Sequence, residues 1–264
     1  MFDGTIDGKI GIFDSGVGGL TVAAKIAELL PTASLMYFGD TKYVPYGVRP
    51  VGEVVELVER ICRYLVDQGA TALVMACNTA AAAAFASVEK WSPVPVFGII
   101  DAAAKAASAH TRNGRIGVIS TDLTAQSGVY VQAVHRNAPQ AKVFVQGCPK
   151  LVLLVEQGRV SGAETEATLH EYIDPMLEEG IDTLVLGCTH FPFLQGALEK
   201  MTEGKVAIVD PAVYVAEELQ ELGYGKGLKP GKHSFTVSGD PHQFARVARQ
   251  LLGSDIGEVM QALD

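Results

Sequence analysis

The sequence contains an internal duplication, and a duplicated chain is expected to fold into two similar parts. The segment TALVMACNT at residues 71–79 is echoed by DTLVLGCTH at residues 182–190. Each consists of a short apolar run, one cysteine and then small hydroxyl or amide residues. Further matching landmarks, Ile10-Gly11 with Ile116-Gly117 and Asp101 with Asp210, keep nearly the same spacing in both halves. The repeat therefore gives Cys77 and Cys188 equivalent positions.

Apolar runs of strand length alternate with longer helical patterns along most of the chain, which is typical of βαβ units on a parallel sheet. We predict an α/β protein of two similar lobes, with mainly parallel, flavodoxin-like sheets related by pseudo-two-fold symmetry. The predicted first lobe comprises residues 1–98 and 210–264, and the second comprises residues 99–209. The predicted strands are Ile10–Asp14, Ser34–Gly39, Ala72–Ala76, Val96–Ile100, Arg115–Ser120, Lys142–Gln146, Thr183–Gly187, Val206–Val209 and His233–Gly239.

Charge and composition exclude several classes of protein. The net charge is −9 and no basic block is present, so we expect no nucleic-acid partner. No apolar stretch approaches 18 residues and the N-terminus lacks the layout of a signal peptide, which predicts a cytoplasmic protein without membrane contact. The four cysteines are scattered and form no Cys-x-x-Cys motif, so we expect neither a metal site nor a disulfide framework.

The two equivalent cysteines carry the functional prediction. Cys77 and Cys188 each stand where a predicted strand meets a helical stretch, and a helix N-terminus lowers the pKa of a thiol. A single cysteine at a strand end is more often a small buried apolar residue, but two at repeat-equivalent positions favour chemistry. Two thiols facing one substrate from opposite sides could remove a proton from one face of a carbon and replace it on the other. His190 could act beside Cys188 as a base or an orienting cation.

Two loops at predicted strand ends are further candidates. The segment DSGVGG at residues 14–19 resembles part of a dinucleotide fingerprint. That reading is disfavoured because Thr21 occupies the place of the third glycine and Asp14 would lie beside a pyrophosphate; the alternative is a tight turn in which Asp14 caps the helix. In the second loop, Gly39–Gly47, backbone N–H groups and Tyr46 could hold a small anion, although many such loops are simple connections.

Together these motifs resemble the cofactor-independent aspartate/glutamate racemase family, and within it the bacterial glutamate racemases. The matching segments are DSGVGG at 14–19, PYG at 45–47, ACNT at 76–79 and GCTH at 187–190. The resemblance implies two α/β lobes with the substrate between them. It also implies interconversion of L- and D-glutamate without a cofactor or metal, and a supply of D-glutamate for peptidoglycan.

The resemblance also assigns residues. It implies that Cys77 and Cys188 are the two catalytic thiols, that Asp14 accompanies the first, and that Glu156 and His190 accompany the second. The substrate-binding residues that it implies are Asp14, Ser15, Pro45, Tyr46, Gly47, Asn78, Thr79, Thr189 and His190.

Alternatives remain open. An aspartate or other amino-acid racemase is the nearest, although the resemblance favours glutamate because related aspartate racemases typically carry Glu at the position of His190. A cysteine-dependent amidase using Cys188, His190 and Glu156 would leave Cys77 without a purpose. A non-catalytic two-lobed amino-acid binding protein is the third alternative. We expect a homodimer, as is common for soluble enzymes.

Overall fold

A computed structural model describes residues 8–227 and 229–262. The chain divides into two compact units, the first formed by Met1–Ile99 with Ala212–Asp264 and the second by Ile100–Pro211. Each unit contains one parallel sheet. Within the described ranges, no helix combines the length and the apolar character needed to cross a bilayer.

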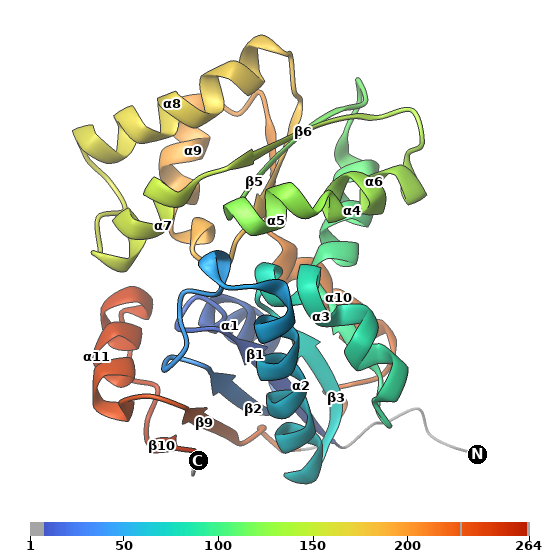
Figure 1. Cartoon of the computed structure of the whole chain (residues 1–264), viewed down its shortest axis with the longest axis vertical. Coiled ribbons are helices and arrows are strands. Elements are labelled where there is room, and N and C mark those ends of the chain that lie inside the picture. Colours follow the sequence, from blue (N-terminus) through green and yellow to red (C-terminus); the bar gives the residue numbers. More distant parts are fainter. Residues whose placement is uncertain (1–7, 228, 263–264) are drawn as a thin grey trace. The chain divides into compact units, whose positions relative to one another are not determined.

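The sheet of the first unit has the strand order β10-β9-β2-β1-β3-β4, and every neighbouring pair is parallel (Figure 1). Its central strand is almost entirely buried, with Ile10, Ile12 and Phe13 at most 1 % exposed. A strand buried on both faces reads as a continuous apolar run, which explains why β1 could be recognised from the sequence. The strands are β1 (Lys9–Asp14), β2 (Ser34–Gly39), β3 (Ala70–Met75), β4 (Val96–Gly98), β9 (His233–Val237) and β10 (Val259–Gln261).

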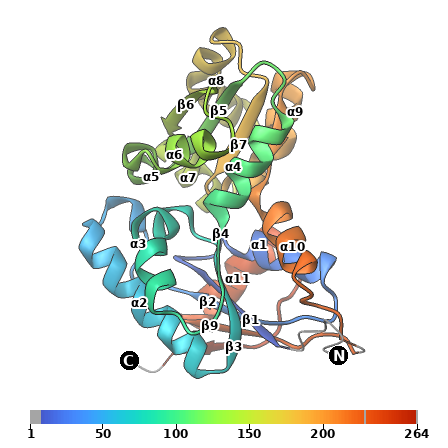
Figure 2. The ribbon, with the colours of Figure 1, turned by 90° about the vertical axis from the view of Figure 1, so that its right-hand side faces the viewer.

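Helices cover both faces of this sheet (Figure 2). The neighbouring residues Tyr37 and Phe38 of β2 point to opposite faces, as successive strand residues must. Tyr37 contacts the ring of Phe244 on α11, whereas Phe38 contacts the ring of Tyr64 on α2, so α2 and α11 lie on opposite faces. The helices are α1 (Leu20–Leu29), the 3₁₀ helix η1 (Tyr46–Val48), α2 (Val51–Asp67), α3 (Asn78–Trp91), α10 (Pro211–Glu221) and α11 (Pro241–Leu252).

The second unit repeats the core of the first. Its sheet order, β6-β5-β7-β8, is the order β2-β1-β3-β4 of the first unit with the equivalent strands in the same places. The predicted α/β class with parallel sheets is therefore confirmed. The elements are α4 (Ile99–His110), β5 (Arg115–Ser120), α5 (Asp122–Ser127), α6 (Val129–Asn137), β6 (Lys142–Gly147), α7 (Pro149–Glu156), α8 (Ala163–Glu178), β7 (Thr183–Gly187), η2 (Phe191–Leu194), α9 (Gln195–Thr202) and β8 (Ala207–Val209).

Some predicted boundaries are wrong. The strand predicted over Val96–Ile100 ends at Gly98, because helix α4 already begins at Ile99. The strand predicted over His233–Gly239 ends at Val237, and the following loop leads to α11, where Asp240 caps the helix by accepting bonds from two backbone N–H groups. Cys188 is followed by turn residues and the short 3₁₀ helix η2 rather than directly by an α-helix.

Candidate active site

In the first unit, three acidic or thiol side chains follow adjacent strands at one edge of the sheet. Asp14 ends β1, Asp40 directly follows β2, and Cys77 lies two residues beyond β3. Ligands collect at the carboxyl edge of open parallel sheets, so this edge is the expected place for a site. All three residues are buried, with exposures of 0 %, 0 % and 5 %.

Cys77 precedes helix α3 as its N-cap residue, and its Sγ lies 3.5 Å from the hydroxyl of Ser15. Burial and, secondarily, the negative charge of Asp14 raise the pKa of this thiol to about 11, although hydrogen bonds from Ser15 and the backbone of Ala80 partly oppose the rise. The expectation that the helix N-terminus would lower the pKa is therefore wrong here, because desolvation outweighs it. At neutral pH Cys77 carries its proton.

The loop after β1 is shaped around the Asp14 carboxylate. The backbone N–H of Gly16 donates to Asp14 Oδ1 at 2.8 Å, and the hydroxyl of Tyr37 donates to the carbonyl of Gly16 at 2.7 Å. A Cβ on Gly19 would lie 2.4 Å from the Cβ of Asp14, so only glycine fits there. This geometry disfavours dinucleotide binding, because the Gly16 N–H that would face a phosphate is already bonded to a carboxylate.

Tyr46 is hydrogen-bonded to Asp40, a residue for which the sequence predicted no role. Its hydroxyl donates to Asp40 Oδ2 at 2.5 Å, and the ring is 1 % exposed. Burial, and then the negative charge of Asp40, raise the pKa of Tyr46, so its phenol stays protonated. The signal for Asp40 was present in the sequence as a single acid directly after a buried strand.

The other predicted binding residues of the first unit are neighbours of Cys77 and Tyr46 in the sequence, but their exposure to solvent differs. Asn78 and Thr79 are the first two residues of α3 and are 2 % and 3 % exposed. Pro45 is exposed and Gly47 is half-buried, on either side of Tyr46. The predicted binding residues Asn78 and Thr79 are thus buried at the N-terminus of a helix, whereas Pro45 and Gly47 are more accessible to solvent.

In the second unit, Cys188, His190 and Glu156 form a chain of contacts. The Sγ of Cys188 lies 3.6 Å from Nδ1 of His190, and Nε2 of the same ring lies 3.7 Å from Oε1 of Glu156. Cys188 and His190 are 6 % and 8 % exposed, and Thr189 between them is 6 % exposed. Glu156 is the last residue of α7 and its side chain is exposed.

The protonation states in this chain follow from burial. Burial lowers the pKa of His190 to about 4, so the imidazole is neutral at physiological pH. Partial desolvation raises the pKa of Glu156 above its ordinary value. If Nδ1 accepts from the thiol, the proton is on Nε2 and points to Glu156. The carboxylate is then placed to stabilise an imidazolium if one forms.

Tyr130 of α6 is a further residue beside Cys188 that sequence reasoning missed. It is 1 % exposed, and burial followed by the negative charge of a Cys188 thiolate raises its pKa. Its ring also lies 3.1 Å from the place that a Cβ on Gly187 would occupy, directly before the cysteine. No motif in the sequence marks this tyrosine, because it lies in an ordinary amphipathic helix.

Comparisons with known proteins identify the family of this chain. Residues 21–219 match the family model described as Asp/Glu/Hydantoin racemase. The glutamate racemases of Syntrophus aciditrophicus and Neisseria meningitidis serogroup A are 42 % and 41 % identical, covering 94 % and 95 % of this chain and 93 % and 94 % of their own lengths.

Solved structures are similar over almost the whole chain. A glutamate racemase isoform from Bacillus anthracis is 38 % identical with a TM-score of 0.92, covering 97 % of both chains. The glutamate racemase of Francisella tularensis, solved in complex with D-glutamate, is 28 % identical with a TM-score of 0.89, covering 97 % of this chain and 98 % of its own. The parallel α/β fold and these matches define the class of protein as a racemase. This chain belongs to the Asp/Glu/hydantoin racemase family.

Proposed function

We propose that this protein is a glutamate racemase that interconverts L- and D-glutamate by proton transfer at Cα between two thiols. The observation that carries the proposal is that Cys77 and Cys188 occupy equivalent places, each buried beside a polar partner at the end of an equivalent strand. Relatives named glutamate racemase, at about two-fifths identity and matched over nearly their whole length, support glutamate as the substrate.

For the conversion of L- to D-glutamate, Cys188 acts as the base. Neutral His190 faces its thiol through Nδ1 and accepts the proton as the thiolate forms, with Glu156 stabilising the resulting positive charge. The thiolate removes the Cα proton, and Cys77, protonated because its pKa is raised, donates its own proton to the opposite face. One C–H bond breaks and one forms. The enzyme is left with a Cys77 thiolate and a His190 imidazolium, and loss of a proton from His190 to solvent with uptake of one by Cys77 restores the starting state.

For the reverse conversion the roles exchange. Cys77 becomes the base, with the carboxylate of Asp14 as the nearby acceptor for its proton, while hydrogen bonds from Ser15 and Ala80 stabilise the thiolate. The carbanion-like intermediate is stabilised by backbone N–H groups at the start of α3 and by the low exposure of both thiols. This scheme requires both thiols to reach one substrate molecule.

The wider setting is part of the proposal. We expect the product D-glutamate to feed peptidoglycan synthesis in the cytoplasm, and the enzyme to need neither cofactor nor metal. We also expect a homodimer, which light scattering of the purified protein would test.

The activity is tested by following optical rotation or circular dichroism with pure L- or D-glutamate, and with the two aspartate enantiomers as comparison substrates. We expect glutamate to racemise from either side to an equal mixture, unaffected by EDTA, and aspartate to react at least about 100-fold more slowly, since the site is built around specific polar contacts. An aspartate racemase from Picrophilus torridus shares the fold at 19 % identity and a TM-score of 0.58. Equal turnover of aspartate, or ammonia release from glutamine instead of racemisation, would replace the proposal by one of the alternatives.

A further inference from the structure

Tyr37 lies inside the first sheet, yet its hydroxyl reaches the loop that follows the neighbouring strand. It belongs to β2, is 1 % exposed and lies opposite Ile12 of β1, two residues before that strand ends at Asp14. Its hydroxyl donates to the carbonyl oxygen of Gly16, a buried residue, at 2.7 Å. Buried carbonyl groups need hydrogen-bond partners, and Tyr37 supplies one from a different strand.

The same hydroxyl also contacts the far end of the loop. The place that a Cβ on Gly19 would occupy lies 2.9 Å from Oη of Tyr37 and 2.4 Å from the Cβ of Asp14. The phenol oxygen, the Asp14 side chain and the Gly19 backbone therefore meet at one point. Tyr37 thus holds the loop of residues 14–19 at two positions, one by a hydrogen bond and one by close packing.

The ring that carries this hydroxyl is fixed in place. Its centre lies 6.2 Å from the ring centre of Phe235 on β9 and 6.0 Å from that of Phe244 on α11. Aromatic pairs at this spacing stabilise one another. Burial, and then the negative charges of Asp14 and Cys77, raise the pKa of Tyr37, so the phenol keeps the proton that it donates.

The loop held by Tyr37 carries the groups that surround Cys77. The backbone N–H of Gly16 donates to Asp14 Oδ1 at 2.8 Å, and the hydroxyl of Ser15 lies 3.5 Å from the Sγ of Cys77. A hydrogen bond from the backbone of Ser15 to the same sulfur opposes the rise in the pKa of Cys77. Because Ser15 directly precedes Gly16, any shift of the Gly16 carbonyl moves the residue that faces the thiol.

We propose that Tyr37 is a positioning residue for the half of the reaction in which Cys77 is the base. By holding the carbonyl of Gly16, its hydroxyl keeps Ser15 and Asp14 in place at the thiol. This inference rests on the proposed racemase function. It predicts that proton removal from D-glutamate depends on Tyr37 and that proton removal from L-glutamate does not, because the contacts described above are all with residues of the first unit.

The test measures deuterium labelling at Cα in D₂O in two backgrounds that each retain one thiol, with Tyr37→Phe removing only the hydroxyl. In Cys188→Ser, where Cys77 remains, we expect Tyr37→Phe to slow the labelling of saturating D-glutamate about tenfold or more, since small displacements around a reacting atom can cost this much. In Cys77→Ser, labelling of saturating L-glutamate should change by less than about twofold, as for independent sites. Saturating substrate separates proton transfer from affinity.

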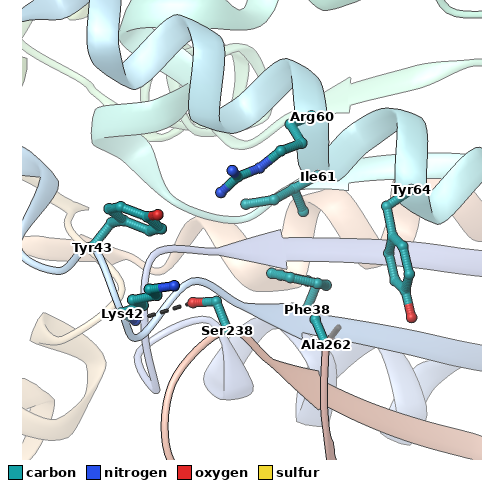
Figure 3. A pocket seen from close by; sticks show the side chains of 8 residues that line it. All are labelled: Phe38, Lys42, Tyr43, Arg60, Ile61, Tyr64, Ser238 and Ala262. Carbon is teal, nitrogen blue, oxygen red and sulfur yellow. Dashed lines mark hydrogen bonds between the residues drawn. The ribbon is translucent and has the colours of Figure 1, made fainter. Parts of the chain in front are cut away.

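The matched control is Tyr64→Phe, which removes the same hydroxyl from a tyrosine of α2. Tyr64 packs against Phe38, the neighbour of Tyr37 that points to the opposite face of the sheet, and the two line a separate pocket (Figure 3). We expect this variant to leave both labelling rates unchanged. Hydrogen exchange followed by mass spectrometry should show faster exchange of residues 14–19 in Tyr37→Phe and not in Tyr64→Phe.

The outcomes separate this inference from the function on which it rests. Unchanged labelling of D-glutamate in Tyr37→Phe, equal slowing for both enantiomers, the same slowing in Tyr64→Phe, or unchanged hydrogen exchange of residues 14–19 would each overturn the role of Tyr37 and leave the two-thiol scheme intact. If Cys188→Ser with Tyr37 present did not label D-glutamate, the proposed function would be wrong and the inference would fall with it.

Discussion

Burial determines the protonation states of the residues on which the proposed chemistry depends. Cys77 keeps its proton because desolvation and the Asp14 charge disfavour a thiolate, and His190 is neutral because desolvation disfavours an imidazolium. The two groups are consequently prepared for opposite tasks, one to donate a proton and the other to accept one. Neither state could be read from the sequence, since the pKa of each group depends on how much solvent its neighbours exclude.

The neutral state of His190 has a consequence for stability. Its pKa is about 4 in the folded protein against about 6.5 when unfolded, so between these values the unfolded chain binds a proton that the folded chain does not. The contribution of His190 to the free energy of unfolding is therefore constant above pH 6.5. It falls as the pH drops from 6.5 to 4, and the total loss from this group is about 3 kcal/mol.

Urea unfolding of the wild type and of His190→Asn at pH 8, 6, 5 and 4 measures this effect. We expect the two proteins to differ in their pH dependence over this interval, with the wild type losing more stability toward pH 4. Parallel curves would mean that the imidazole titrates normally in the folded protein and that the assigned neutral state is wrong.

At the scale of elements, the sequence predicted strands and helices best where burial imposes a single pattern. The bounds of β2, β5 and β7 agree with their predicted ranges, because their apolar residues are buried in continuous runs. Strand β10 was missed, since only three residues pair and Met260 is 49 % exposed. The contacts of Asp40 and Tyr130 were also beyond prediction, because they depend on which elements pack together.

Two glycines, one before a helix and one within a helix, differ in whether there is room for a side chain. Gly19 precedes α1, where a Cβ would meet Asp14 at 2.4 Å, whereas Gly52 in α2 has open space around it. We expect Gly52→Ala to stabilise the protein by about 0.5–1 kcal/mol through helix propensity. Gly19→Ala should destabilise it by about 1–3 kcal/mol, as overpacking does, and should displace Asp14.

Thermal and urea unfolding of both variants, with racemisation measured beside them, tests this pair. Activity should fall in Gly19→Ala and remain at the wild-type level in Gly52→Ala. Equal stability changes in the two variants would contradict the close packing of the loop against Asp14.

For the whole molecule, the duplication is the feature from which the function follows. The order β2-β1-β3-β4 recurs as β6-β5-β7-β8, so each unit presents one cysteine beyond the equivalent strand, β3 or β7. The repeat in the sequence predicted that Cys77 and Cys188 follow equivalent strands. Differences in length between the two halves lie between strands and do not change which strand precedes each thiol. The partners of the thiols differ between the units, with Ser15 and Asp14 beside Cys77 and His190 beside Cys188.

This difference predicts that each thiol handles one enantiomer. L- and D-glutamate have equal free energies in water, so kcat/KM must be the same in both directions, and the assignment cannot be tested by comparing those values. Exchange of the Cα proton with solvent is free of this constraint, because a single remaining thiol can remove a proton and return a deuteron on the same face.

The most direct test is therefore to incubate Cys77→Ser and Cys188→Ser separately with each enantiomer in D₂O, and to measure deuterium at Cα together with the enantiomer formed. Racemisation should fall about 10²–10⁴-fold in both variants, as is typical when an acid or base is removed. Cys77→Ser should still label L-glutamate and Cys188→Ser should still label D-glutamate, each without inversion. Racemisation within about tenfold of the wild-type rate in either variant, or equal labelling of both enantiomers by both variants, would contradict the two-thiol account.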